Sequence, residues 1–89
     1  MARYKLILRT LMRVELLGYR RRNGRTQEEM AEKLHITPRS YIDLEHGKYG
    51  SSTVTLLFFL ALLPDAKMAE LVRTFALRAR EADENVRIA

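Results

Sequence analysis

The sequence predicts an all-α fold, a compact bundle of five helices. Helix-forming residues dominate the 89-residue chain, which has only two prolines, four glycines and few β-branched runs. Start and stop signals divide the chain into five segments, most of them with apolar residues at spacings of three and four. A chain of this length holds one modest core. We therefore expect a single domain over residues 1–82 and a flexible tail over residues 83–89.

The first predicted helix covers about residues 3–23. It ends at Asn23-Gly24, where glycine suits the left-handed residue that closes a helix. An alternative is that the helix is two pieces, with the segment YKLILRT extended. Its apolar stripe consists of Tyr4, Leu8, Leu11, Met12, Leu16 and Tyr19.

The second and third predicted helices are short and have clear start signals. Thr26 with Glu29 three residues later has the pattern of a capping box. Thr37 caps the third helix, and Pro38 occupies its first position. Only about three residues, "HIT", separate the two helices. This spacing is typical of a helix-turn-helix, whose second helix enters the major groove of DNA.

The fourth and fifth predicted helices contain much of the apolar residue content. The fourth begins after a Ser52 cap and ends at Pro64. Its segment VTLLFFLALL is too short to span a bilayer and is therefore expected to be a buried core helix. The fifth begins with Asp65 as its cap and covers about residues 65–82, with a stripe of Met68, Leu71, Val72, Phe75 and Ala79.

The charge is unevenly distributed along the chain. Residues 1–25 hold eight Lys or Arg and one Glu, a net charge of +7, whereas residues 26–50 have a net charge of −2. A basic end favours a polyanionic partner, either nucleic acid or a membrane surface, although basic residues also keep small domains soluble. The chain has no cysteine, which is consistent with a reducing cytoplasm.

The segment TQEEMAEKLHITPRSYIDLEHGK resembles the XRE/Cro/CI-type helix-turn-helix family of phage and bacterial transcriptional repressors. The resemblance covers about residues 14–63 and includes Ala31, the Ile-Thr turn and the Leu-Glu-x-Gly-Lys ending at Leu44–Lys48. It implies a lambda-repressor-like fold, with the helix-turn-helix at about residues 26–46. It further implies a cytoplasmic, bacterial or phage-encoded regulator, a repressor that binds a double-stranded DNA operator.

The resemblance also implies a role for each position of the motif. Arg39 would bridge guanine O6 and N7, unless it pairs with Asp43 one turn later. Asp43 would point outward near the bases. Arg20 and Glu45 would form a partly buried ion pair between the first and third helices. The base-facing residues would be Thr37, Pro38, Arg39, Asp43 and His46, and the phosphate contacts Gln27, Lys48, Tyr49, Ser51, Ser52 and Thr53.

Two positions depart from the family pattern. His35 replaces the usual glycine of the turn, so we expect it to adopt a left-handed conformation at a cost of roughly 1 kcal/mol. Arg25 replaces a usual apolar residue. Arg25 lies at the corner between the first and second predicted helices, and His35 lies in the turn between the second and third.

The apolar surface of residues 1–13 and of the fifth helix favours a homodimer, with recognition helices about 34 Å apart. Alternatively, these two segments pack on each other within one monomer. An antitoxin-like or other partner-binding module could use the same fold, and the basic N-terminus permits a membrane-surface protein. Because neither histidine nor carboxylate spacing fits a metal site or a catalytic triad, we expect no enzyme, cofactor or metal.

Overall fold

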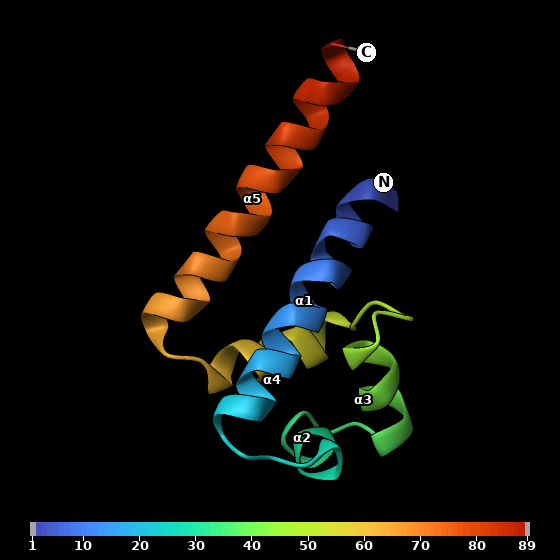
Figure 1. The fold of residues 1–89 in the computed structure, drawn as a ribbon, viewed down its shortest axis with the longest axis vertical. Helices are drawn as coiled ribbons and strands as arrows, with labels where there is room; N and C mark the ends of the chain where they lie inside the picture. Colours follow the sequence, from blue (N-terminus) through green and yellow to red (C-terminus); the bar gives the residue numbers. More distant parts are fainter. Residues whose placement is uncertain (1, 89) are drawn as a thin grey trace.

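The computed structural model describes residues 2–88 as five helices, with side chains described for residues 3–86 (Figure 1). The helices are α1 (Ala2–Arg22), α2 (Gln27–Lys33), α3 (Pro38–Glu45), α4 (Thr53–Leu62) and α5 (Asp65–Ile88). The predicted all-α class is confirmed. Because α1 is one continuous helix, the alternative of two pieces is wrong. No helix among the described residues is long and apolar enough to cross a membrane.

Side-chain caps fix where three of the helices begin. Thr26 accepts a hydrogen bond from the Glu29 amide at 3.0 Å, and the Glu29 carboxylate accepts one from the Thr26 amide at 2.8 Å. Thr37 and Ser52 cap α3 and α4 in the same manner. These three predicted caps are confirmed, whereas Asp65 proves to be the first residue of α5 and not its cap.

Helices α1, α2 and α3 end in the same local motif, in which a left-handed residue follows the cap. At the end of α3, the Gly47 amide donates to Leu44 and the Lys48 amide donates to Asp43, which is the Schellman arrangement. The left-handed residue of α1 is Gly24, with φ of 61°, and that of α2 is His35, with φ of 60°. The expected left-handed conformation of His35 is confirmed.

Replacement of His35 by glycine is expected to change stability little, whereas replacement by alanine is expected to lower it. Glycine removes the roughly 1 kcal/mol of left-handed strain but loses the ring contact with Phe58, whose centroid lies 4.3 Å away. That contact is worth about 0.5–1.5 kcal/mol. Alanine keeps the strain and loses the contact, so H35A should melt at a lower temperature than H35G by roughly 4–8 °C. Equal melting temperatures of the two variants would contradict this account.

The core lies where α1, α2, α3 and α4 meet, and α5 contributes to its edge. Leu16, Met30, Tyr41 and Phe59 are fully buried there. Full burial of one large apolar side chain stabilises the fold by about 1.5–3 kcal/mol. Of the apolar run in α4, Phe59 and Leu63 point inward, while Val54, Leu57 and Phe58 are exposed. The expected core helix is therefore buried on one face only, and its other face is exposed.

Helices α1 and α5 lie side by side in opposite directions, so that their outer ends form an arm beside the core (Figure 1). At the outer end, the Arg3 guanidinium lies 2.6 Å from the Asp83 carboxylate. Nearer the core, Lys67 lies 3.6 Å from Glu15. Of the two alternatives for residues 1–13 and the fifth helix, the structure shows packing within one chain.

Helix α5 continues to Ile88, well beyond the expected end near residue 82. Residues 83–88, which were expected to lie in the tail, are therefore part of α5, while residue 89 lies outside the described residues. Contact with α1 accompanies this extension, because Asp83 of α5 pairs with Arg3 and accepts a hydrogen bond from the Tyr4 hydroxyl.

Candidate nucleic-acid interface

The central feature of the candidate site is the close crossing of α2 and α3. Ala31 is almost completely buried at this crossing, and its small side chain permits close approach of the two helices. Ile36, in the short turn between them, packs against the core cluster. Tyr41 and Leu44 face inward from α3. The opposite side of α3 is left exposed at its N-terminal half.

A buried carboxylate fixes α3 to the two preceding helices. Glu45 is only 5% exposed and accepts two hydrogen bonds from Arg20 of α1, at 2.7 and 2.8 Å. It also accepts one from Gln27 of α2 at 3.2 Å and one from the Tyr41 hydroxyl. Through these four hydrogen bonds the Glu45 carboxylate connects α1, α2 and α3. The ion pair of Arg20 with Glu45 is present, and Gln27 braces α3 through the same carboxylate.

The ionisation of this network follows from its geometry. Burial alone would raise the pKa of Glu45, but the hydrogen bonds from Arg20, Tyr41 and Gln27 outweigh burial and hold that pKa below its ordinary value. The hydrogen bond to Glu45 raises the pKa of Arg20. Burial, followed by the hydrogen bond to Glu45, raises the pKa of Tyr41. At neutral pH the carboxylate is therefore charged and the phenol is protonated.

The lowered pKa of Glu45 predicts a loss of stability in acid. A carboxyl whose pKa is lower in the folded state contributes stability above its unfolded-state pKa, and that contribution is lost as pH falls through the folded-state pKa. The free energy of unfolding should thus fall below about pH 4.3, the ordinary value for Glu. Urea titrations at a series of pH values measure it. A Glu45→Gln variant should show a shallower fall, and an equally steep fall would contradict the assignment.

Four of the five predicted base-facing residues lie on the exposed side of α3. Thr37, Pro38, Arg39 and His46 are exposed. The Arg39 side chain is 73% exposed, and its guanidinium is 3.4 Å from the Asp43 carboxylate. A surface pair of this kind is worth little, so it orients Arg39 without holding it strongly.

Asp43 is the exception among these residues. Its side chain is only 14% exposed, so the expectation that it points outward is wrong. The segment after α3 returns alongside the helix, and Ser51 and Ser52 line the same small cavity as Asp43. The carboxylate therefore lies between Arg39 and the α3–α4 loop. Of the two alternatives for Arg39, the structure shows the contact with Asp43, and the Arg39 side chain remains exposed.

The predicted phosphate contacts, apart from Gln27, lie together on the α3–α4 loop and the first residue of α4. Lys48, Tyr49, Ser52 and Thr53 are exposed, and the Lys48 ammonium lies 5.5 Å from the centroid of the Tyr49 ring. Ser52 uses its hydroxyl to cap α4, accepting from the Thr55 amide at 3.1 Å. Ser51 is partly covered, and its hydroxyl oxygen is buried.

Sequence reasoning missed two features of this surface. One is the buried Tyr41, whose hydroxyl donates to Glu45 one turn later. The four-residue spacing of these two residues on a helix is a signal that could have revealed the contact. Arg13 of α1 also lies against the end of α3, where its Cδ would be 3.3 Å from a Cβ built on Gly47. It lies before the segment covered by the resemblance.

This geometry defines a helix-turn-helix, and a comparison with protein families agrees. A family model described as "Helix-turn-helix" matches residues 17–71, more than half of the chain. The chain belongs to the XRE/Cro/CI-type helix-turn-helix family. This is a family of DNA-binding transcription regulators. Comparisons with curated proteins and with solved structures give no match.

Proposed function

We propose that this chain is a sequence-specific transcriptional repressor of a bacterium or phage, acting in the cytoplasm, and that residues 38–46 read the major groove of an operator. The observation that carries the proposal is the Glu45 network. It fixes α3 against α1 and α2 while Arg39 remains 73% exposed. Base readout requires side chains on a rigid helix whose position in the groove is fixed.

Contacts with phosphates would orient the domain on the duplex. Amide groups at the start of α4, next to Ser52 and Thr53, are suited to bind an anion because they lie at the positive end of a ten-residue helix. Lys48 and Tyr49 would contact the backbone from the preceding loop. Gln27 already donates one amide N–H to Glu45. Its second amide N–H would donate to another phosphate of the duplex.

Selection of binding sites from random duplex DNA, repeated at several salt concentrations, tests the proposal. We expect a sequence logo with two-fold symmetry and an affinity that falls steeply with salt. A salt dependence without any logo would overturn sequence-specific binding. A reporter gene with the selected site over its promoter then tests repression, and an increase in expression would overturn the repressor assignment.

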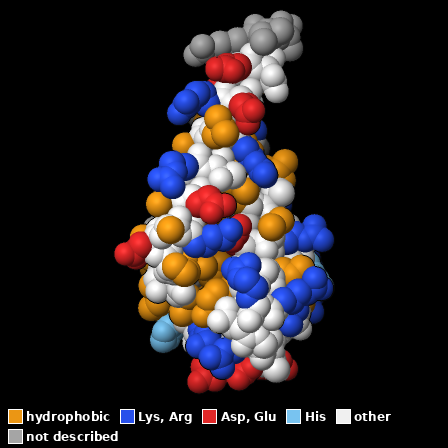
Figure 2. Space-filling model, turned by 60° about the vertical axis from the view of Figure 1, so that its left-hand side comes forward, with side chains coloured by type: hydrophobic (Ala, Val, Ile, Leu, Met, Phe, Trp, Pro, Cys, Tyr) orange, Lys and Arg blue, Asp and Glu red, His pale blue; other side chains and the backbone are white. Residues whose placement is uncertain are grey.

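The two-fold symmetry expected of the site rests on a proposed homodimer. Val54, Leu57 and Phe58 expose apolar side chains on α4, and Figure 2 shows hydrophobic side chains gathered in the lower half of the face drawn there. A second copy of the chain would cover this patch. Sedimentation analysis should show a concentration-dependent dimer that a Leu57→Glu substitution disrupts. A wild-type chain that stays monomeric on the operator would contradict it.

Asp43→Ala is expected to alter which operators are bound more than it alters the fold. Removal of the carboxylate frees Arg39, whose guanidinium is 3.4 Å away, to take up other orientations in the groove. Binding to all sequences should tighten slightly because a negative charge is lost, while discrimination between sites weakens. Site selection with the variant measures both effects. An unchanged logo would refute this role for Asp43.

A second candidate is an antitoxin-like or other partner-binding regulatory module. The exposed Val54, Leu57 and Phe58 of α4 support it equally well, since a different protein could cover them. This candidate predicts that the isolated chain does not bind DNA specifically and that Leu57→Glu abolishes capture of one defined protein. A logo obtained from the isolated chain would exclude it as the sole function.

A further inference from the structure

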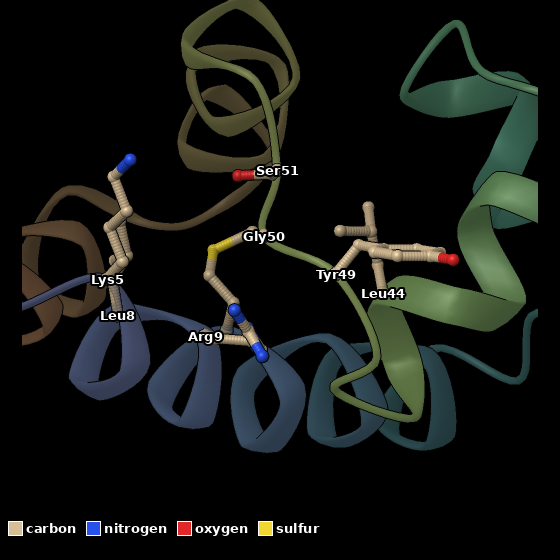
Figure 3. Close-up of a pocket in the computed structure, with 8 residues that line it drawn as sticks. Lys5, Leu8, Arg9, Leu44, Tyr49, Gly50 and Ser51 are labelled. Atoms are coloured by element: carbon tan, nitrogen blue, oxygen red, sulfur yellow. The ribbon is translucent and has the colours of Figure 1, made fainter. Parts of the chain in front are cut away.

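A cavity of about 440 Å³ lies between the N-terminal half of α1 and the loop that joins α3 to α4 (Figure 3). Its volume falls within the range of pockets that hold small ligands. Leu8 and Met12 of α1 and Leu44 of α3 provide its apolar lining. A Cβ at Gly50 would meet no atom within 4 Å, so the space beside this residue of the cavity wall is unfilled. A ligand with an apolar body could bury surface here.

The polar groups of this cavity come from both walls. Lys5 and Arg9, one turn apart on α1, place two positive charges along it, and Ser51 contributes a hydroxyl from the loop (Figure 3). The Nε of Arg9 and the Oγ of Ser51 are both buried, and neither has a hydrogen-bond partner among the described side chains and backbone. Buried donors are nearly always satisfied in folded proteins, so these two need a partner.

We propose that this cavity is a binding site for a small amphipathic anion, a carboxylate with an apolar body. The positive charges of Lys5 and Arg9 attract the carboxylate, and Arg9 and Ser51 offer N–H and O–H donors on the cavity walls. The apolar body lies against Leu8, Met12 and Leu44. Among the residues that the structure describes, no carboxylate lines the cavity, so the charged side chains on its walls favour an anion.

The phosphates of DNA fit this cavity less well than a free small molecule does. A phosphate of the duplex binds exposed cations and amide groups at the protein surface, and it has no apolar body to place against leucine and methionine.

Occupancy of the cavity would be linked to DNA binding, a step that rests on the proposed function. Tyr49 and Ser51 line the cavity and also belong to the loop proposed to contact phosphates. A ligand that holds the loop in one arrangement changes the affinity for DNA, and DNA changes the affinity for the ligand by the same factor. The binding of the ligand itself does not depend on the proposed function.

Nuclear magnetic resonance titration of the full chain with sodium octanoate tests the site without DNA. We expect saturable shifts of the amides of Arg9, Met12, Gly50 and Ser51. Octan-1-ol, which lacks the charge, and acetate, which lacks the apolar body, should bind at least tenfold more weakly. Equal binding of octanoate and octan-1-ol, or octanoate shifts centred on Val54, Leu57 and Phe58 of α4, would overturn the proposal.

Substitutions locate the charge contact. Arg9→Gln should weaken octanoate binding roughly tenfold or more, whereas Arg78→Gln, at an exposed position on α5, should leave it unchanged. If Arg9→Gln keeps octanoate affinity but lowers affinity for every DNA sequence, Arg9 serves the DNA backbone and the proposal is overturned. Unchanged DNA affinity in saturating octanoate would overturn the linkage. A chain that binds octanoate but no DNA would count against the proposed function alone.

Discussion

Glu45→Ala is expected to lower the free energy of unfolding by about 3 kcal/mol and the melting temperature by roughly 10–25 °C. The change leaves Arg20 without its anionic partner and the Tyr41 hydroxyl buried without an acceptor. Removal of one member of a buried pair costs about 3–5 kcal/mol. We take the lower end because the Arg20 side chain is still 22% exposed and water can solvate it.

Thermal and urea unfolding measure this effect, and matched variants identify its source. Glu32→Ala removes an exposed acid of α2 and should change stability by no more than about 0.5 kcal/mol. Glu45→Gln keeps the shape of the side chain, and its free energy of unfolding should lie between those of Glu45→Ala and Glu32→Ala. If the melting temperature of Glu45→Ala equals that of the wild type, the carboxylate does not hold α3 in place. The main support for the proposed function is then lost.

Arg39→Ala is expected to reduce affinity for the selected operator by roughly 5-fold to 150-fold, equivalent to about 1–3 kcal/mol of base discrimination. The guanidinium is 73% exposed and bonds only weakly to Asp43, so the fold should be unaffected. Most of the loss should fall on a single base pair, at which the logo becomes flat. Competition binding with operators altered at each position measures it.

Lys48→Ala provides the contrast for Arg39. Lys48 is exposed on the loop, and its loss should weaken binding to all sequences alike and reduce the salt slope by about one. Arg73, exposed on α5, serves as a neutral control. If Arg39→Ala behaves as Lys48→Ala does, with uniform loss and an intact logo, Arg39 contacts the backbone and does not read a base.

The parts of the fold that the sequence predicted well are those fixed by neighbours along the chain. The caps at Thr26, Thr37 and Ser52 depend on residues three positions away, which the sequence displays directly. The left-handed conformation of His35 was expected because this residue replaces the usual glycine of the family's turn. The pair of Arg20 with Glu45 spans a longer separation, and only the resemblance to the family indicated it.

The features that were missed depend on contacts between distant segments. Polar residues after position 82 have the composition of a tail, yet α5 continues there, where Asp83 contacts Arg3 and Tyr4 of α1. Asp43 occupies a helical position that faces outward, but the returning loop covers it. The cavity beside Arg9 arises where α1 meets the α3–α4 loop, and no local pattern marks such a meeting.

The arm formed by α1 and α5 has a consequence for the order in which the protein folds. Arg3 and Asp83 are 80 positions apart, so their contact closes a loop of almost the whole chain. The α2–α3 pair is joined by a few residues and needs little loop closure. Since local contacts form faster than distant ones, the α2–α3 pair can assemble while the two chain ends are still apart. Closure of the arm is then the late step.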